Sequence, residues 1–182
     1  LKTATPNAKG ICICCGAEMI AKCGSIKVHH WLNKSRKHCD PWWENETQWH
    51  RDWKNQFPKE WQEVVHIADD GEKHIADIKT PEGLVIEFQP SSIKSEEVDA
   101  RDAFYKDIIL VVDGSRLKRD QERATHFNWR SFENDVYDIA EPSFLPKNWT
   151  NRSVPVFFDF GIDTWLYRLI WQKHILKGEG PV

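Results

Sequence analysis

The sequence predicts an α/β protein with a mixed sheet, whose central elements follow the order helix, strand, strand, strand, helix, strand. Three β-branched, alternating runs and one continuous apolar run indicate strands, because a half-buried strand alternates and a fully buried strand does not. Two stretches with helical spacing and recognisable end signals indicate the helices. The expected helices are 45–57 and 95–106, and the expected strands are 63–68, 74–80, 84–89 and 108–112.

The hairpin expected between the second and third strands determines which side chains face one another. Pro81 suits the first central position of a turn, and Gly83 can adopt the left-handed conformation that closes a three-residue loop. With that loop Asp77 faces Glu87, and Gln89 lies on the same face because strand side chains alternate. A two-residue loop would instead place the two acids on opposite faces.

Two carboxylates and an amide on one face form a set of oxygen ligands. Ligands of this kind suit a hard cation such as Mg²⁺. A solvated polar face is the alternative, because most Asp and Glu side chains simply lie in water. The hairpin pattern by itself leaves both interpretations open.

The first expected helix carries two rows of residues with i, i+4, i+8 spacing. The aromatic row must face the sheet, and the polar row lies about 60° to one side of it. A polar row at the edge of the buried face can reach a site on the sheet, although a salt-bridge row on a wet surface has the same spacing. The aromatic row is Trp49, Trp53 and Phe57, and the polar row is Glu46, His50 and Lys54.

Start and stop signals set the limits of the helices. Pro58 should end the first helix, because proline lacks the amide hydrogen that a helix interior needs. Ser95 is the expected N-cap of the second helix, which has acidic residues in its first turn. In the C-terminal part a strand is expected over 154–160, followed by a helix that Asp163 caps and Gly178 ends.

Composition restricts the class of protein. The chain has 182 residues and a net charge of −3, which fits one domain with a small appendage and gives no global basic field. Because no stretch approaches roughly 18 consecutive apolar residues and the first residues lack a secretion signal, we expect a cytoplasmic protein without a membrane span. The expected segments are 1–41, 42–114 and an extension at 115–182 that packs on the core.

The first segment is rich in cysteine and histidine. Five clustered cysteines, an odd number, argue against a disulfide framework and for a reducing compartment. Cys12 and Cys15 have the C-x₂-C spacing of a zinc knuckle, and a short segment without its own core gains stability from such a site. Buried cysteines without metal are the alternative. The preferred ligand set for a structural Zn²⁺ is Cys12, Cys15, His30 and Cys39.

These residues together resemble the competence protein CoiA-like nucleases. The N-terminal cysteines and the His29-His30-Trp31 motif look like the metal-binding region of that family, and the segment 155–161 shows a weaker similarity. The resemblance implies a PD-(D/E)xK-type core, whose αβββαβ order agrees with the expected elements, and a Mg²⁺- or Mn²⁺-dependent deoxyribonuclease. The matching core segments are 43–54, Ala76-Asp77, Ile86–Ser92 and Arg101 with Phe104-Tyr105.

The family pattern carries over onto the site residues. Asp77 and Glu87 would hold the catalytic Mg²⁺ or Mn²⁺, and His50 would act as general base or hold a metal-bound water. Glu46 would be an additional ligand. The usual lysine of the motif is replaced by Gln89, an amide that cannot carry a charge.

Two positions depart from the family in ways that affect the site. Lys54 or Lys79 could supply the charge that the missing lysine would carry, and we prefer Lys54 because it lies in the polar helix row. Asn33 stands where the family often has a second histidine, which leaves the zinc ligand set open. Arg101 and Tyr105, one helical turn apart, could contact the scissile phosphate or could be a surface cation and a core tyrosine.

Three further basic residues could follow a nucleic-acid backbone. They lie next to the cysteine-rich segment, and they are Lys34, Arg36 and Lys37. Two other functions remain open: a catalytically inactive DNA-binding module of the same fold, and a zinc-stapled protein-interaction module. The sequence also leaves open a homo-oligomer or a protein partner, and the strandedness of the DNA.

Overall fold

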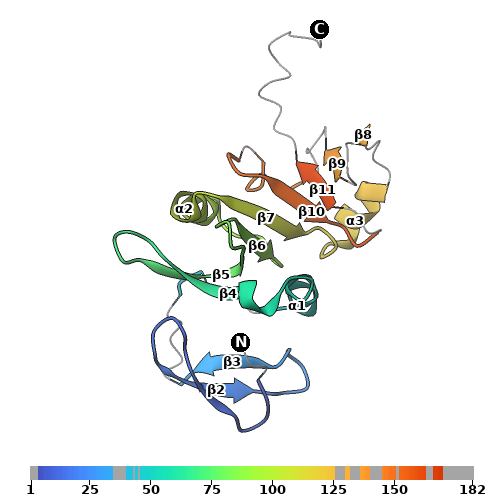
Figure 1. Cartoon of the computed structure of the whole chain (residues 1–182). Helices are drawn as coiled ribbons and strands as arrows, with labels where there is room; N and C mark the ends of the chain where they lie inside the picture. Colours follow the sequence, from blue (N-terminus) through green and yellow to red (C-terminus); the bar gives the residue numbers. More distant parts are fainter. Residues whose placement is uncertain are drawn as a thin grey trace. The chain divides into compact units, whose positions relative to one another are not determined.

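The computed structural model divides the chain into two compact units, residues 1–90 and 91–182, each of which is described by itself. The protein is a mixed α/β structure with few helices (Figure 1). No helix in the described part of the chain is long and apolar enough to cross a membrane. The structure describes residues 4–34, 40–42, 44, 46–125, 130–131, 136–139, 145–150, 152–162 and 166–169.

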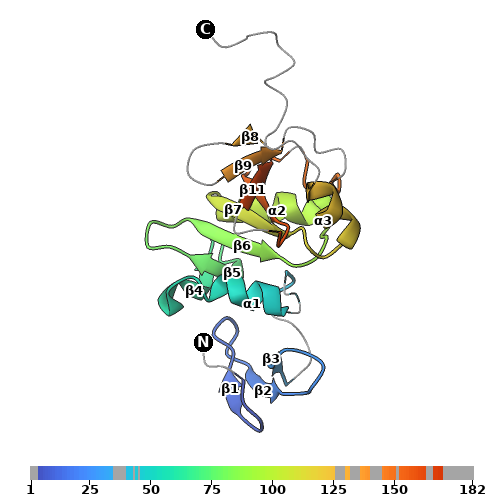
Figure 2. The ribbon, with the colours of Figure 1, turned by 90° about the vertical axis from the view of Figure 1, so that its right-hand side faces the viewer.

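The first unit begins with a small antiparallel sheet that is separate from the later strands (Figure 2). Asp40 follows this sheet and ties the chain to the start of a later strand, because its carboxylate accepts hydrogen bonds from the backbone N–H of Ile75 and from Nδ1 of the buried His74, each at 2.8 Å. Trp42 stacks on the His74 ring with 3.4 Å between centroids. The strands, in spatial order, are β1 (Lys9–Ile11), β2 (Glu18–Lys22) and β3 (His30–Asn33).

The rest of the first unit consists of a helix and an antiparallel meander of three strands. Thr47 begins the helix by accepting a 3.2 Å hydrogen bond from the His50 amide, and the helix ends at Asn55, within the limit set by Pro58. The helix is α1 (Gln48–Lys54), a short 3₁₀ turn η1 covers Lys59–Trp61, and the strands are β4 (Gln62–Ile67), β5 (Lys73–Lys79) and β6 (Val85–Gln89).

Phe88 is the point on β6 where α1 packs. Its ring is 1% exposed and lies 5.8 Å from Trp53, in a stacked arrangement, and 6.2 Å from both Trp49 and Phe57. The prediction that the aromatic row of the helix faces the sheet is therefore confirmed. This packing fixes the rotation of α1, and with it the direction of the polar row.

The second unit contains five strands in the order β7-β10-β11-β9-β8, with parallel and antiparallel pairs alternating. Its buried side chains include Trp149, Phe158 and Phe160, each 2% exposed or less. The elements are α2 (Ser95–Tyr105), β7 (Ile108–Asp113), α3 (Lys118–Thr125), β8 (Arg130–Ser131), β9 (Val136–Ile139), β10 (Val156–Asp159) and β11 (Leu166–Leu169).

Along the chain, the order α1, β4, β5, β6, α2, β7 is the predicted order of the central elements. Two expectations were wrong. The N-cap of α2 is Lys94, and the Ser95 hydroxyl instead accepts a 2.6 Å hydrogen bond from Arg152. Residues 118–125, for which no element was expected, form the helix α3.

The predicted C-terminal helix is replaced by a strand over residues 166–169. Residues 166–169 form strand β11, in which Tyr167 pairs with Phe158 and Arg168 with Phe157 of β10. Pairing with an existing strand outweighs a weak local preference for helix. The expected helix limits, Asp163 and Gly178, lie outside the described residues.

The turn before β6 contains a glycine in a left-handed backbone conformation. Gly83 has φ +100°, so Gly83→Ala should destabilise the protein by about 1–2 kcal/mol, because a side chain strains this backbone conformation. Gly24→Ala is the matched control, because a Cβ there meets nothing within 4 Å and no left-handed φ is required. Urea unfolding of both variants measures the difference, and equal stabilities would contradict the strain.

Candidate active site

The β5–β6 hairpin brings the predicted acids together. The ladder pairs Ile78 with Ile86 and Lys79 with Val85, so the next position places Asp77 opposite Glu87. The Thr80 amide donates a 2.9 Å hydrogen bond to the Leu84 carbonyl, which closes the three-residue loop at residues 81–83. The predicted turn and register are both confirmed.

At the Asp77–Glu87 position, side chains take the place of backbone ladder bonds. The Phe88 amide donates a 2.9 Å hydrogen bond to Asp77 Oδ2, and the Asp77 amide donates a 3.3 Å hydrogen bond to Glu87 Oε1. Glu87 is 4% exposed. The two carboxylates are therefore held between β5 and β6 by backbone donors.

His50 approaches the same carboxylate from α1. Its Nε2 lies 2.8 Å from Asp77 Oδ1, and both side chains are largely buried. This is a hydrogen-bonding distance, so the contact with His50 favours the ionised form of Asp77. In the described part of the chain Nδ1 of His50 has no hydrogen-bond partner.

Gln89 lies two residues after Glu87 and is 2% exposed. Among the described residues its Oε1 finds no hydrogen-bond partner. Because a buried acceptor without a partner is costly, such an atom calls for a water, an ion or a ligand. The amide oxygen is thus a candidate ligand beside the Asp77–Glu87 pair.

Lys54 also belongs to this site. Its side chain is 7% exposed, its Nζ lies 2.6 Å from Glu46 Oε1, and it forms a second ion pair with Glu63. Burial would lower the pKa of Lys54, but the charges of Glu63, Asp77 and Glu46 outweigh burial and raise it. The lysine therefore carries a positive charge next to Asp77.

Lys79, the other candidate for this charge, is engaged elsewhere. Its Nζ lies 2.8 Å from Nδ1 of His66 on the neighbouring strand β4. Lys54, by contrast, interacts with Asp77, and its role in place of the missing lysine stays a prediction.

Glu46 was expected as an additional metal ligand, but both of its carboxylate oxygens contact cations. Oε1 faces Lys54, and Oε2 accepts from Arg51, whose guanidinium also donates to the His29 carbonyl at 2.8 Å. Burial raises the pKa of Glu46, but Lys54 and Arg51 together lower it. Glu46 thus pairs with cations, which makes it a less suitable metal ligand than the sequence suggested.

Sequence reasoning missed Glu63. The β4–β5 register pairs Gln62 with Ile78 and Val64 with Ala76, so Glu63 lies opposite Asp77. Glu63 has φ +54°, a left-handed value that is unusual for a residue with a side chain. No sequence signal gives this away, since the conformation favours glycine and the position holds a glutamate.

The positions of the possible ligand side chains limit where a metal ion could bind. Among the described residues no three His, Cys, Asp or Glu side chains lie close enough together to hold a metal ion. At the hairpin, the oxygen atoms that could contact a divalent cation belong to Asp77, Glu87 and the amide of Gln89. This set of two carboxylates and one amide fits a hard cation that keeps several water ligands, as Mg²⁺ does.

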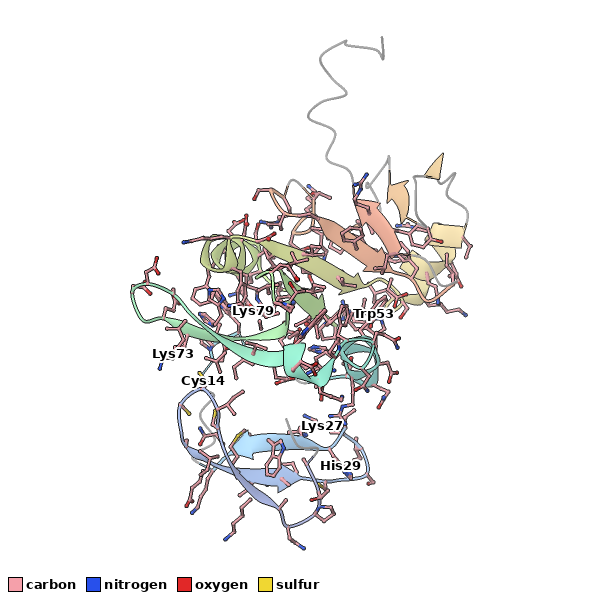
Figure 3. All side chains as sticks on the ribbon, in the orientation of Figure 1. Cys14, Lys27, His29, Trp53, Lys73 and Lys79 are labelled. Carbon is pink, nitrogen blue, oxygen red and sulfur yellow. The ribbon has the colours of Figure 1, made fainter. Side chains whose placement is uncertain are left out.

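The predicted zinc ligands are only partly brought together. Cys12 and Cys15 lie in the turn between β1 and β2, where Cys14 is labelled in Figure 3, and Gly16 donates a 2.9 Å hydrogen bond to the Cys12 carbonyl. His30 pairs with Lys22, whereas Cys12 bonds to Ala17.

Lys22, the partner of His30, lies five residues along the chain from Ala17, the partner of Cys12. In an extended strand five residues span about 17 Å, whereas a bond between zinc and its ligand is only about 2.0–2.3 Å long. His30 therefore does not join the cysteine turn. Cys39, the fourth expected ligand, lies outside the described residues.

The residues expected to contact a nucleic acid differ in how exposed they are. Lys34 is exposed and pairs with Glu18 at 2.6 Å. Arg36 and Lys37 lie outside the described residues. Arg101 and Tyr105 are both buried in the second unit, where Arg101 donates to Glu97 at 2.7 Å, so Arg101 is not a surface cation.

Comparison with known proteins gives no relative: no family model, no curated protein and no solved structure matches this chain.

The electrostatics of Asp77 give a pH-dependent prediction. Burial raises its pKa, but His50, Lys54 and the Phe88 amide lower it from 3.8 to about 2. A carboxyl with a depressed pKa stabilises the fold above about pH 4, and this contribution is lost as the pH falls towards 2.

The stability difference between the wild type and Asp77→Asn should therefore shrink by about 2 kcal/mol between pH 5 and pH 2.5. Urea unfolding at several pH values measures it, with the exposed Asp69→Asn as a control that keeps the wild-type pH dependence. A constant difference between the wild type and Asp77→Asn across this range would show that the folded protein does not depress the pKa.

Proposed function

We propose that the protein is a metal-dependent nuclease that hydrolyses DNA phosphodiester bonds on a PD-(D/E)xK-type core. The observation that carries this proposal is the facing pair Asp77 and Glu87, with the buried Gln89 two residues further along β6, whose amide oxygen has no hydrogen-bond partner among the described residues. The chain order of the elements supports the fold, and the resemblance to CoiA-like nucleases supports DNA as the substrate.

The charge balance of the site favours a divalent cation. The cluster contains four carboxylates and two permanent cations, so with a neutral His50 its formal charge is −2. Uncompensated charge in a largely buried cluster is unfavourable. The four acids are Glu46, Glu63, Asp77 and Glu87, and the two cations are Arg51 and Lys54.

The residues of this chain have distinct tasks in such a site. Asp77, Glu87 and Gln89 would hold Mg²⁺ or Mn²⁺, which when bound polarises a phosphate and lowers the pKa of a water ligand. His50 accepts the proton of the attacking water, because imidazole is a suitable base near neutral pH. Lys54 brings positive charge from α1 towards the negative charge that develops on the phosphate.

Removal of either acid should abolish cleavage. Asp77→Asn and Glu87→Gln keep the side-chain shape but remove a charged ligand, so each should reduce Mg²⁺- or Mn²⁺-dependent cleavage of labelled DNA by at least about 100-fold. Glu82→Gln, in the exposed loop of the same hairpin, removes the same charge and should cut at the wild-type rate. Single- and double-stranded substrates are tested in parallel, with circular dichroism to confirm folding.

Wild-type activity in either acid variant would overturn the proposal. Metal-independent DNA binding without cleavage by the wild type would instead identify an inactive DNA-binding module, the function that the amide at Gln89 favours. A wild-type protein with no affinity for DNA would leave the zinc-stapled protein-interaction module.

We also propose a structural Zn²⁺ at the cysteine turn, without His30. Purified protein should then contain about one zinc per chain, and Cys15→Ser should lose it, because a structural site needs all of its ligands. His30→Ala should retain it, because the strand register separates His30 from the turn. Elemental analysis of the three proteins decides, and loss of zinc in His30→Ala would restore the set expected from the sequence.

A further inference from the structure

Two consecutive residues of β4 both hold Lys54. Gln62 donates from Nε2 to the Lys54 carbonyl at 2.7 Å and to the Phe57 carbonyl at 2.8 Å. Glu63 forms an ion pair with Nζ of the same lysine. One end of β4 thus fixes both the backbone and the ammonium group of Lys54.

Neighbouring residues of a regular strand do not normally reach the same partner. Their side chains point to opposite faces of the sheet. The left-handed backbone of Glu63, at φ +54°, interrupts this alternation. The rungs on either side, Gln62 with Ile78 and Val64 with Ala76, keep one register, so no inserted residue explains it.

A left-handed conformation is unfavourable for a residue with a side chain, and it persists only where the surroundings impose it. The contact that accompanies it at Glu63 is the one with Lys54. A long lysine side chain has many rotamers, and here carboxylates from two segments restrict it: Glu46 before α1 and Glu63 on β4.

We infer that Glu63 is a positioning residue that, together with Glu46, holds the ammonium group of Lys54 towards Asp77. This inference rests on the proposed nuclease function. It explains how the helix supplies the charge that Gln89 cannot supply. A fixed charge stabilises a developing negative charge more effectively than a mobile one, because its orientation is set before the reaction.

The test uses two substitutions of Glu63 that both remove its charge but differ in the backbone strain that they leave. Glu63→Gln removes the charge and keeps the strain, whereas Glu63→Gly removes the charge and accepts the left-handed conformation easily. Both should lower kcat for DNA cleavage about 10- to 100-fold, the effect expected for a misplaced group. Glu60→Gln, exposed in η1, is the control for the charge change and should keep the wild-type kcat.

The affinities distinguish a positioning residue from a metal ligand. In both Glu63 variants the KM for DNA should stay within about twofold of the wild type, and the Mn²⁺ dissociation constant from calorimetry should rise far less than kcat falls, because Glu63 adds only part of the negative charge of the cluster. In a Lys54→Gln background, Glu63→Gln should cause no further loss of kcat, because the two residues act through one contact. A Mn²⁺ affinity that falls in parallel with kcat, or additive losses in the double variant, would overturn the inference.

A measurement independent of activity separates this inference from the proposed function. With ¹⁵N-labelled lysine, the ammonium signal of Lys54 should be protected from exchange in the wild type and in Glu60→Gln, and lost in both Glu63 variants. If the wild type fails to cleave DNA, the nuclease proposal falls while this signal still reports whether Glu63 holds Lys54. An unchanged signal in Glu63→Gln and Glu63→Gly would overturn the positioning role.

Discussion

The hydrogen bond from the Phe88 amide to Asp77 Oδ2 is the contact on which the candidate site depends. It replaces a ladder bond, so the carboxylate lies between two strands and not above a sheet surface. The side chain of the same Phe88 anchors the aromatic row of α1. One residue therefore fixes the acid with its backbone and the helix with its ring, and His50 meets Asp77 because both are fixed together.

The polar cluster around this contact is organised as alternating charges. Arg51, Glu46, Lys54 and Glu63 form a chain of ion pairs that ends beside Asp77. Each buried charge has a neighbour of opposite sign, which reduces the cost of removing it from water. The remaining negative charge is concentrated on the hairpin acids, where oxygen ligands are available.

The sequence predicted those parts of the site that depend on local chemistry. The turn at Pro81 and Gly83 sets the hairpin register, and the spacing of Trp49 and Trp53 sets the direction of α1. Both signals lie within a few residues of one another in the sequence, so they can be recognised without knowing which other segment they pack against. This is why the facing acids followed from the residues, whereas the place of His50 in the site was expected from the family resemblance.

The failures involve choices that only the tertiary structure makes. Glu63 adopts a conformation that its residue type disfavours, and Glu46 gives its second oxygen to Arg51, a pairing that the helical spacing does not reveal. The separation of His30 from the cysteine turn follows from the register of β2 with its two neighbours. The composition of the segment carries no sign of that register.

Asp40 has a consequence for how the chain can be divided. Its carboxylate accepts the Ile75 amide and the His74 ring, two and three positions before Asp77 on the same strand. A fragment that began at residue 42 would leave a strand-end N–H without its acceptor and a buried imidazole without its carboxylate at Nδ1. A cut before residue 40 would keep these contacts with the hairpin, whereas a cut just after it would take them from the strand that carries Asp77.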